Sequence, residues 1–365
     1  NRQSSGLKSR NGSFARKRMP TERPALIADG RFELDRKLGE GSFGEVFKGL
    51  DRRTGNPVAI KFEERSTSAP GSLKNEAYLL DMLRRPYQRH GFAEVLHFCR
   101  MANWSILIME LLGQSLEDCV ETCGGTLMVP TTTLVAEQAI HRIEYLHSKC
   151  IVHRDIKPEN FMLGLGRKCA HLYLIDFGLS VRYWDKRHVS MSTSSSLTGT
   201  ARYASINAHR GCTQSRRDDL ESIGHMLLYF LRGVLPWSGL KAKTQEEKFK
   251  KIAETKEKYS LVDLCKGFPE EFKTFLHYSR NLGFRERPDY EMLLRMFKEL
   301  RKKVGVVEDW ELQWLSPKDV DFKNLIPMDP GCGHQQPDDH LARASKGCFR
   351  WGIRRVTAKA PQDKE

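Results

Sequence analysis

Long apolar runs are missing from this sequence. No segment approaches the roughly 18 to 20 consecutive apolar residues of a membrane-spanning helix. The basic start also lacks the apolar stretch of a secretory signal, although the chain begins at Asn1, not Met, and leaves open what precedes it. No segment repeats with a period of roughly 20 to 50 residues, which excludes solenoids and propellers. We therefore expect one two-lobed fold or two domains with sizeable cores, without a transmembrane segment.

Disulfide patterns are absent as well. The 9 cysteines are odd in number and scattered, and none belongs to a C-x-x-C pair. This pattern favours reduced thiols in an intracellular protein of the cytoplasm or nucleus. Near the C-terminus, the spacing of Cys332, His334, His340 and Cys348 is too irregular to predict structural zinc. Cys348, next to Phe349 and several basic residues, leaves a lipidated peripheral membrane anchor as an alternative.

The net charge of +14 is concentrated at the two ends. Residues 1–28 carry seven Lys or Arg against Glu22 alone, and residues 331–365 carry seven against four acids. Such tails favour solubility or loose attraction to polyanions, and we expect no specific nucleic-acid binding. We predict a disordered basic tail over residues 1–29 and a loose, basic C-terminal extension over residues 316–365.

Hydrophobic periodicity divides the middle of the chain into two lobes. Between about residues 30 and 112 it predicts a small antiparallel sheet with one helix, and between about 113 and 315 a mainly helical lobe. The predicted strands of the first lobe cover residues 32–34, 45–49, 58–62 and 106–109, with a helix over 73–83. In the second lobe Ser115 can cap a helix, and longer helices are expected over residues 131–148, 216–233, 244–255, 269–280 and 289–303. The fold class is therefore α+β.

Two short motifs carry the chemistry. Residues 153–160 read HRDIKPEN, and residues 176–178 read DFG. They place the oxygen-bearing side chains of Asp155, Asn160 and Asp176 on two short loops, as an enzyme that holds Mg²⁺ and a nucleoside triphosphate requires. Asp155 is the candidate base for a substrate hydroxyl, Lys157 lies near the transferring group, and Asn160 and Asp176 are the candidate metal ligands.

A glycine-rich turn and a lysine precede these motifs. Residues 39–44, GEGSFG, lie between two strands, which favours a flap over phosphates rather than a dinucleotide fingerprint. Gly39, Gly41 and Gly44 let backbone N–H groups approach phosphate oxygens. Lys61 in the next strand can reach a phosphate, and Glu76 on the following helix is its predicted ion-pair partner. Taken singly, each match is weak, since a hairpin turn, a strand lysine and a surface glutamate would look the same.

The order and spacing of these motifs resemble a eukaryotic protein kinase. The segments that resemble the casein kinase 1 family within it are residues 109–113 (MELLG), 197–207 (LTGTARYASIN), 215–222 (SRRDDLES) and 235–240 (LPWSGL). Ser205, Ile206 and Asn207 stand where most kinases have Ala-Pro-Glu. The resemblance covers roughly residues 31–315 and implies a monomeric Ser/Thr protein kinase using ATP and Mg²⁺, active without loop phosphorylation.

The resemblance also implies further roles. Met109 would be the gatekeeper beside the adenine, Glu110 and Leu112 would offer hinge backbone groups, and Asp219 would brace the catalytic loop. The remaining nucleotide contacts implied by it are Leu38, Ser42, Val46, Ala59, Met162 and Ile175. The family favours Ser or Thr downstream of an acidic or phosphorylated residue, which implies an anion pocket. The matching positions are Arg202, Gly239 and Lys248, with Arg154 and Lys241 nearby.

Departures from the family pattern concern the substrate surface. Val181 stands where a lysine is common, and residues 245–247 (QEE) replace a more basic stretch, so part of the positive surface is missing. Residues 188–196 are shorter and rich in serine. Ser190, Thr193 and Ser196 recur every three residues, so a phosphate on one would prime the next. The competing interpretation is a flexible loop that is never modified.

Two other function classes stay open on the sequence alone. The first is a nucleotide-binding scaffold without catalysis, although each key catalytic residue is present. The second is a polyanion-binding or membrane-associated adaptor dominated by its tails, for which steeply salt-dependent binding would be diagnostic.

Overall fold

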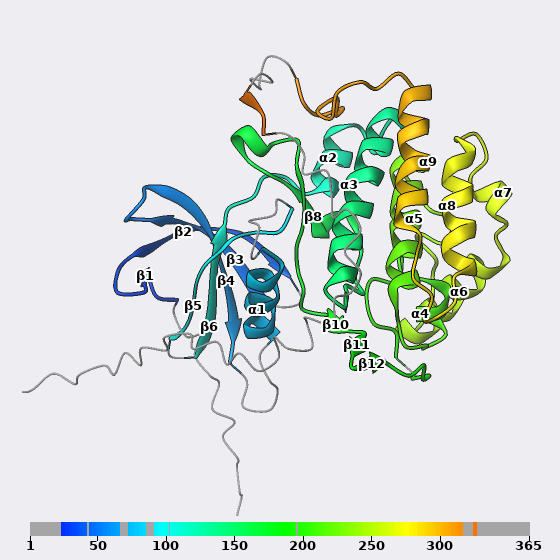
Figure 1. Cartoon of the computed structure of the whole chain (residues 1–365). Coiled ribbons are helices and arrows are strands. Elements are labelled where there is room, and N and C mark those ends of the chain that lie inside the picture. The colour runs from blue at the N-terminus through cyan, green and yellow to red at the C-terminus, as the bar shows by residue number, and fades with distance from the viewer. Residues whose placement is uncertain are drawn as a thin grey trace, which may run out of the picture.

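The computed structural model of the chain describes residues 23–41, 44–65, 72–84, 91–101, 103–194, 196–316 and 324–326. An antiparallel sheet with helix α1 forms one lobe, and a bundle of helices forms the other (Figure 1). This arrangement confirms the predicted α+β class. No helix among the described residues combines the length and the apolarity that crossing a membrane requires.

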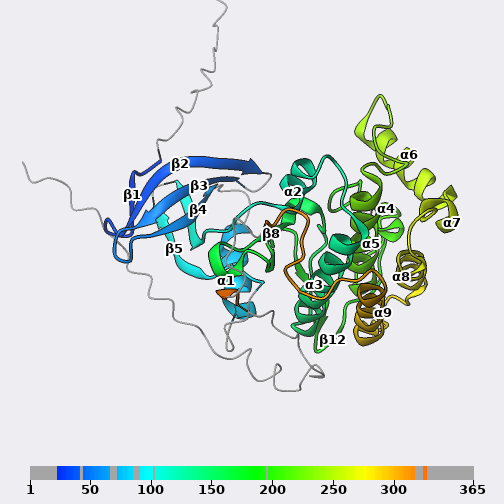
Figure 2. The same ribbon diagram turned by 90° about the horizontal axis from the view of Figure 1, so that it is seen from above.

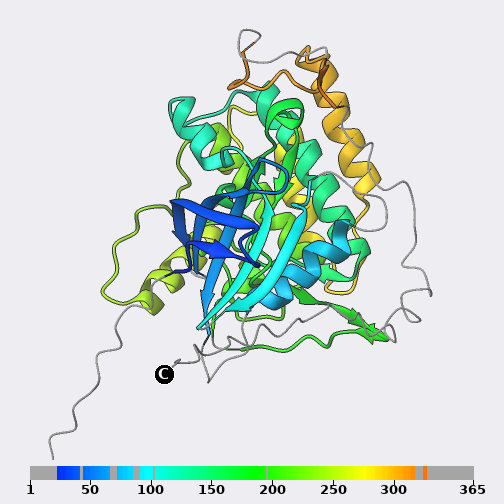
Figure 3. The same ribbon diagram turned by 90° about the vertical axis from the view of Figure 1, so that its left-hand side faces the viewer.

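The sheet of the first lobe has the strand order β1-β2-β3-β4-β6-β5, and Figure 3 shows it in front of the helices. All its neighbouring strands run antiparallel. Its elements are β1 (Leu26–Ile27), β2 (Phe32–Gly41), β3 (Gly44–Asp51), β4 (Asn56–Glu64), β5 (Val95–Met101) and β6 (Trp104–Glu110), with α1 (Ser72–Arg84) between β4 and β5. The predicted strands and helix are confirmed with longer bounds, whereas β1 and β5 were not predicted.

Alternation along β4 decides which side chains face which part of the lobe. Val58, Ile60 and Phe62 enter a buried cluster on one face of the sheet. Lys61 lies between two of them in sequence and therefore points to the opposite face, toward α1. The alternation of side chains that buries one face of β4 therefore also places Lys61 on the side of the sheet where Glu76 lies.

The second lobe is built on α3, whose residues are buried along most of its length. Helices α5 and α9 pack directly against it (Figure 2). The helices are α2 (Leu116–Thr122), α3 (Val129–Ser148), α4 (Ile206–His209), α5 (Arg216–Arg232), α6 (Gln245–Lys258), α7 (Leu261–Leu264), α8 (Glu270–Asn281) and α9 (Tyr290–Lys303). The five predicted long helices and the Ser115 cap of α2 are confirmed, and the short α4 and α7 were not predicted.

Short strands and turns carry the loops that face the first lobe. They are β7 (Ile151–Val152), β8 (Phe161–Leu163), β9 (Leu172–Leu174), β10 (Val181–Arg182), β11 (Trp184–Asp185) and β12 (Arg187–His188), with the 3₁₀ helices η1 (Pro158–Asn160) and η2 (Gly166–Lys168). β7 pairs with β10 and β8 with β9. The HRDIKPEN segment begins directly after β7, and the DFG segment lies between β9 and β10.

The sheet of the first lobe includes residues that precede the predicted start of the fold near residue 30. β1 pairs with β2, and the side chain of Ile27 has no exposed surface. The guanidinium carbon of Arg23 lies 5.0 Å from the centroid of the Trp104 ring. The composition of residues 1–29 is polar on average, and this average conceals Ile27, which the sheet buries.

Beyond α9 the chain continues to pack on the second lobe. The side chain of Leu312 is 3% exposed, and Oε1 of Gln313 accepts the backbone N–H of Met128 at 2.9 Å. Farther on, the carbonyl oxygen of Ile326 lies 2.7 Å from Nε2 of His171, so this part of the predicted loose extension is bound to the lobe. Residues 1–22, Ser42 and the Cys348 segment lie outside the described residues.

Candidate active site

Asp155 lies in the loop after β7, and both of its carboxylate oxygens have partners. Oδ1 accepts the backbone N–H and the hydroxyl of Thr200 at 2.8 and 2.7 Å, and Oδ2 lies 3.0 Å from Nζ of Lys157. Burial acts to raise the pKa of Asp155, but the Thr200 hydrogen bond and the Lys157 charge outweigh it, so the pKa lies below that of an ordinary carboxyl group. Asp155 is therefore an ionised, oriented acceptor at neutral pH.

Asp219 of α5 holds the backbone of this loop, as the resemblance implied. Its carboxylate accepts the backbone N–H groups of His153 and Arg154 at 2.7 and 2.8 Å. Arg154 has a φ of 70°, a left-handed conformation that costs a non-glycine residue roughly 1–2 kcal/mol. His147, which the sequence pattern did not single out, lies 2.9 Å from the same carboxylate through Nε2. The buried carboxylate thus stabilises a backbone turn that the loop would not adopt alone.

Asn160 and Asp176, the predicted metal ligands, are held in different ways. Nδ2 of Asn160 donates to the Asp155 carbonyl at 2.8 Å, which leaves its amide oxygen as the available acceptor. Asp176 has a φ of 62°, and Oδ1 accepts the backbone N–H of Gly178 at 3.4 Å. One carboxylate and one amide oxygen are hard donors that suit Mg²⁺, whose other ligands are commonly water and phosphate oxygens. The described residues contain no cluster of three or more His, Cys, Asp or Glu placed to hold a metal, so a cation here depends on this mixed pair.

Lys61 forms the predicted ion pair with Glu76. Nζ lies 2.8 Å from Oε2 of Glu76 and 3.5 Å from Oδ1 of Asp176, and the side chains of Lys61 and Glu76 are 8% and 2% exposed. Burial acts to lower the pKa of Lys61, but the two carboxylates outweigh it and the pKa is raised. An ammonium group therefore lies beside the candidate metal ligand Asp176.

The glycine-rich turn joins β2 to β3, and Gly41 pairs with Gly44 across it. Gly44 has a φ of 128°, and a Cβ there would lie 1.9 Å from the carbonyl oxygen of Phe62. This glycine is therefore required by the close approach of β4. A Cβ on Gly39 would meet nothing within 4 Å, so neighbouring backbone does not restrict that position. The predicted contact Ser42 lies outside the described residues.

The predicted adenine contacts come from strands β2, β3, β4 and β6 of the first lobe, from β8 of the second lobe and from the segments after β6 and β9. Ala59 pairs with Met109 across β4 and β6, and Met162 on β8 makes a β-bridge to Ser115. Val46, Met109, Leu112, Met162 and Ile175 are partly exposed although they adjoin buried strands, and Leu38 is exposed. These apolar side chains offer a surface to a flat ring.

The side chain of Glu110, the predicted hinge residue, makes ion pairs with both lobes. Its Oε1 lies 2.7 Å from Nζ of Lys168 on η2, and its Oε2 lies 3.4 Å from Nη1 of Arg84 at the end of α1. The Glu110 side chain therefore ties the segment between the lobes to one element of each. The sequence offered no signal for these contacts, because the partners are far apart along the chain.

Arg202 is an exposed member of the predicted anion pocket, as are Gly239, Lys241 and Lys248. Its guanidinium carbon lies 5.8 Å from the ring centroids of both Tyr203 and Tyr229. The Tyr203 hydroxyl accepts a hydrogen bond from Nη1 at 3.4 Å, and this contact raises the pKa of Arg202. The guanidinium is therefore oriented by aromatic rings and is not neutralised by an ion pair with any residue that the structure describes.

The other predicted members lie on separate elements. Lys248 is on α6, Lys241 is in the preceding loop, and Gly239 has a φ of 72°. Lys241 and Lys248 form no ion pair within the described part of the chain. Arg154 donates from Nε to the Leu179 carbonyl at 2.7 Å and makes no described contact with Arg202, so it belongs to the catalytic loop.

The serine-rich segment is paired where it is described. The backbone N–H of Ser192 donates to Oγ1 of Thr213 at 3.0 Å, and that of Ser194 donates to the Gly211 carbonyl at 2.7 Å. Thr193 forms a β-bridge with Cys212. The described residues 192–194 are thus held against residues 211–213, while Ser195 lies outside the described residues.

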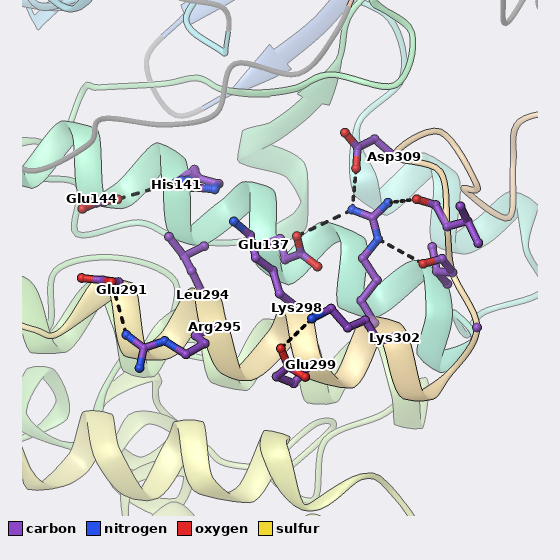
Figure 4. A pocket seen from close by; sticks show the side chains of 14 residues that line it. Glu137, His141, Glu144, Glu291, Leu294, Arg295, Lys298, Glu299, Lys302 and Asp309 are labelled. Carbon is purple, nitrogen blue, oxygen red and sulfur yellow. Dashed lines mark hydrogen bonds and ion pairs between the residues drawn. The ribbon is translucent and has the colours of Figure 1, made fainter.

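A hollow of about 940 Å³ lies elsewhere, between α3 and α9 (Figure 4). Glu137, His141 and Glu144 of α3 face Leu294, Arg295 and Lys298 of α9 across it. None of the predicted site residues lines it. The chemistry-bearing side chains are therefore gathered between the lobes, and this hollow is a separate feature.

Comparison with known families gives a match that includes the whole site. Residues 32–297 match the family model described as Protein kinase domain, which is more than half of the 365 residues. The match begins at the first residue of β2 and ends within α9.

Proposed function

Since the chain belongs to the protein kinase domain family, we propose that it is a Ser/Thr kinase of the casein kinase 1 type. Phosphoryl transfer to proteins is the activity of the family. The proposal adds the acceptor, a Ser or Thr hydroxyl, and the substrate class, proteins with an acidic or phosphorylated residue upstream of that hydroxyl.

The grouping around Asp155 carries the transfer chemistry. An ionised carboxylate with one oxygen fixed by Thr200 is suited to orient a substrate hydroxyl and accept its proton. Lys157, 3.0 Å from the other oxygen, supplies positive charge where negative charge develops on the transferred group. Asp155 and Lys157 thus act on the acceptor side of the reaction.

Protein kinases generally use ATP and Mg²⁺, and the residues present fit both. Asn160 and Asp176 would hold the metal, and Lys61, fixed by Glu76, would bind phosphate oxygens. When bound, Mg²⁺ neutralises phosphate charge and so favours transfer. The partly exposed Val46, Leu112 and Met162 would exclude water from the adenine.

Arg202 supports the proposed substrate class. It is exposed and oriented by two tyrosine rings, and apart from the bond from Nη1 to Tyr203 no hydrogen bond from its guanidinium is described. An arginine can bind a phosphate or carboxylate bidentately, and hydrogen bonds to charged groups contribute roughly 1.5–3 kcal/mol each. The casein kinase 1-like segment 197–207 contains this residue, and Lys248 would add positive charge.

The function is tested with matched peptides that carry Ser, Thr or Tyr, each with and without phosphate on the third residue upstream. We expect transfer to Ser and Thr, favoured by the upstream phosphate. Asp155→Asn should lower kcat by roughly a thousandfold or more, as expected for loss of a catalytic base with its electrostatic role. Asp185→Asn, an exposed residue on β11, is the matched control. Equal rates for wild type and Asp155→Asn would defeat the enzyme proposal.

We also propose autophosphorylation between Ser190 and Thr198. Ser190 and Ser196 are exposed, and phosphate on one residue would prime the next at a spacing of three. Peptide mass mapping after incubation with ATP tests this, with Asp155→Asn as the control for contaminating kinases. Absence of phosphate between Ser190 and Thr198 would contradict it.

A further inference from the structure

Four consecutive carbonyl groups around Arg202 are all held by side chains of the second lobe. Trp237 Nε1 donates to the Arg202 carbonyl at 2.7 Å, and His225 Nδ1 lies 2.9 Å from the Tyr203 carbonyl. Lys256 Nζ donates to the carbonyls on either side, those of Ala201 at 2.8 Å and Ala204 at 2.6 Å. The segment has no regular secondary structure, so these side chains take the place of a backbone ladder.

Lys256 is an unusual residue to find at this position. It belongs to α6, whose buried residues are Ile252 and Lys256. Its side chain has no exposed surface, and Nζ lies 5.2 Å from the centroid of the Trp237 ring. Burying an amine is costly unless its hydrogen bonds are satisfied. A buried lysine would therefore be unfavourable at this position without the hydrogen bonds that Nζ makes.

Backbone carbonyls hold Nζ of Lys256 in its buried position. Burial places the pKa of Lys256 well below its ordinary value, Glu221 opposes this shift, and Arg280 adds to it. Two N–H donors meet the carbonyls of Ala201 and Ala204, and Nε2 of His209 lies 3.2 Å from Nζ and 3.1 Å from the Ala201 carbonyl. The polar contacts of Nζ are therefore made with the segment that contains Arg202 and with His209 of α4.

We propose that Lys256 is a positioning residue for substrate recognition, which fixes the backbone on both sides of Arg202 and so directs the guanidinium toward an anionic group of the protein substrate. This inference rests on the proposed function. Lys256 reaches the segment from inside the lobe and contacts no substrate. It acts through Arg202, whose carbonyl faces inward to Trp237 and whose side chain faces solvent.

The test compares KM and kcat for one Ser peptide with and without phosphate on the third residue upstream. Lys256→Met removes the donors and keeps most of the volume. Its KM for the phosphorylated peptide should rise roughly tenfold, because a misplaced charge-assisted hydrogen bond weakens binding by about that factor. The kcat and the KM for the unphosphorylated peptide should change little. Lys256→Gln, whose amide keeps two donors, should recover part of the difference. Lys258→Met, on the exposed side of the same helix, is the control for loss of one positive charge.

A double variant separates positioning from general packing. In an Arg202→Gln background, Lys256→Met should cause no further change in the ratio of the two KM values. A fall in thermal midpoint with an unchanged ratio in Lys256→Met would overturn the inference while leaving the proposed function intact. If the wild type itself does not distinguish the two peptides, the proposed substrate class fails and the inference fails with it.

Trp237→Phe provides a second measurement if Lys256→Met does not fold. It removes the indole N–H that holds the Arg202 carbonyl and keeps an aromatic ring beside Lys256. The same selective rise in KM, smaller in size, is expected. An equal rise for both peptides would count against a positioning role for this network.

Discussion

Lys61 keeps its charge in a buried position because two carboxylates lie within 3.5 Å of it. Glu76 is the nearer and the more deeply buried of the two, so it fixes where the ammonium points. Asp176, on the other lobe, lies close enough to compete for the same ammonium. The position of Lys61 therefore depends on a balance between one acid of the first lobe and one of the second.

Replacement of Glu76 tests this balance. Glu76→Gln removes the charge that holds Lys61, and we expect kcat/KM for ATP to fall at least roughly tenfold. Because both residues act through the same contact, the double variant Lys61→Met, Glu76→Gln should be little worse than Lys61→Met alone. Steady-state kinetics over an ATP series measure this, with the exposed Glu64→Gln as control. Additive effects of the two substitutions would contradict the shared contact.

For some single residues the sequence predicted the role, and for others it gave no indication of the contacts they make. Lys61, Glu76, Asp155 and Asp176 could be placed because each belongs to a short motif with a fixed spacing. Thr200 could not be assigned its contact with Asp155, because their segments are 45 residues apart and meet only in the fold. Lys256 gave no signal at all, since on sequence it is one of many lysines in a polar helix.

At the scale of elements, Ser205 connects two helices. Its hydroxyl oxygen accepts the backbone N–H of Ala208 at the start of α4, and the hydroxyl donates to Oδ1 of Asp218 on α5 at 2.6 Å. Burial raises the pKa of Asp218 to about 6, while the Ser205 hydrogen bond lowers it. A raised carboxyl pKa contributes stability at low pH that is lost as pH rises through about 6, because the buried group must then ionise.

Ser205→Ala should therefore destabilise the protein more at pH 8 than at pH 5. The cap and the buried hydrogen bond together contribute roughly 1–3 kcal/mol, and loss of the hydroxyl raises the cost of ionising Asp218. Urea unfolding at the two pH values measures the effect. Ser260→Ala is the matched control, because Ser260 caps α7 and donates to Asp263 in the same way but at the surface. A destabilisation that is the same at both pH values would count against the coupling to Asp218.

The packing of α3 against α9 contains a second buried acid. Glu137 is 7% exposed, and no hydrogen-bond partner is described for its Oε1. Burial raises its pKa to about 7, although Arg301, 3.8 Å from Oε2, opposes the shift. Folding therefore favours the protonated form, and this contribution is lost as pH rises from the unfolded value through about 7.

Glu137→Gln should stabilise the protein at pH 8 by up to about 3 kcal/mol and much less at pH 5, because glutamine does not ionise. Chemical unfolding at both pH values measures the difference. Glu299→Gln, an exposed acid lining the same hollow (Figure 4), should show no such pH dependence. A variant less stable than the wild type at pH 8 would show that the ion pair with Arg301 outweighs the cost of burial.

For the whole molecule, the question is where the folded unit ends. The family match stops at residue 297, yet Leu312 is buried and Gln313 bonds to Met128 and, through its backbone N–H, to Thr131. These contacts cover the start of α3, the central helix of the second lobe. The boundary near residue 315 stays a prediction, and the contact between Ile326 and His171 lies beyond it.

A chain that ends at Ile326 keeps these contacts and should have the thermal midpoint of the full chain, whereas one that ends at Lys303 should unfold several degrees lower. Burial of a leucine side chain alone contributes roughly 1.5–3 kcal/mol. Leu312→Ala in the full chain should reproduce much of this loss, about 2–4 kcal/mol with the cavity it leaves. Calorimetry of these chains provides the measurement, and equal midpoints for the two truncated chains would place the boundary at α9.

The sequence alone determined the two lobes, the long helices and the order of the chemical motifs. These features depend on periodicity and spacing, which are local properties of the chain. Only the tertiary structure decided which other groups meet: Thr200 with Asp155, His147 with Asp219, and Lys256 with the carbonyls beside Arg202. The same holds for the start of the fold, where Ile27 is buried by strands that follow it. Such contacts depend on the distance between segments in space, and a linear pattern carries no record of that distance.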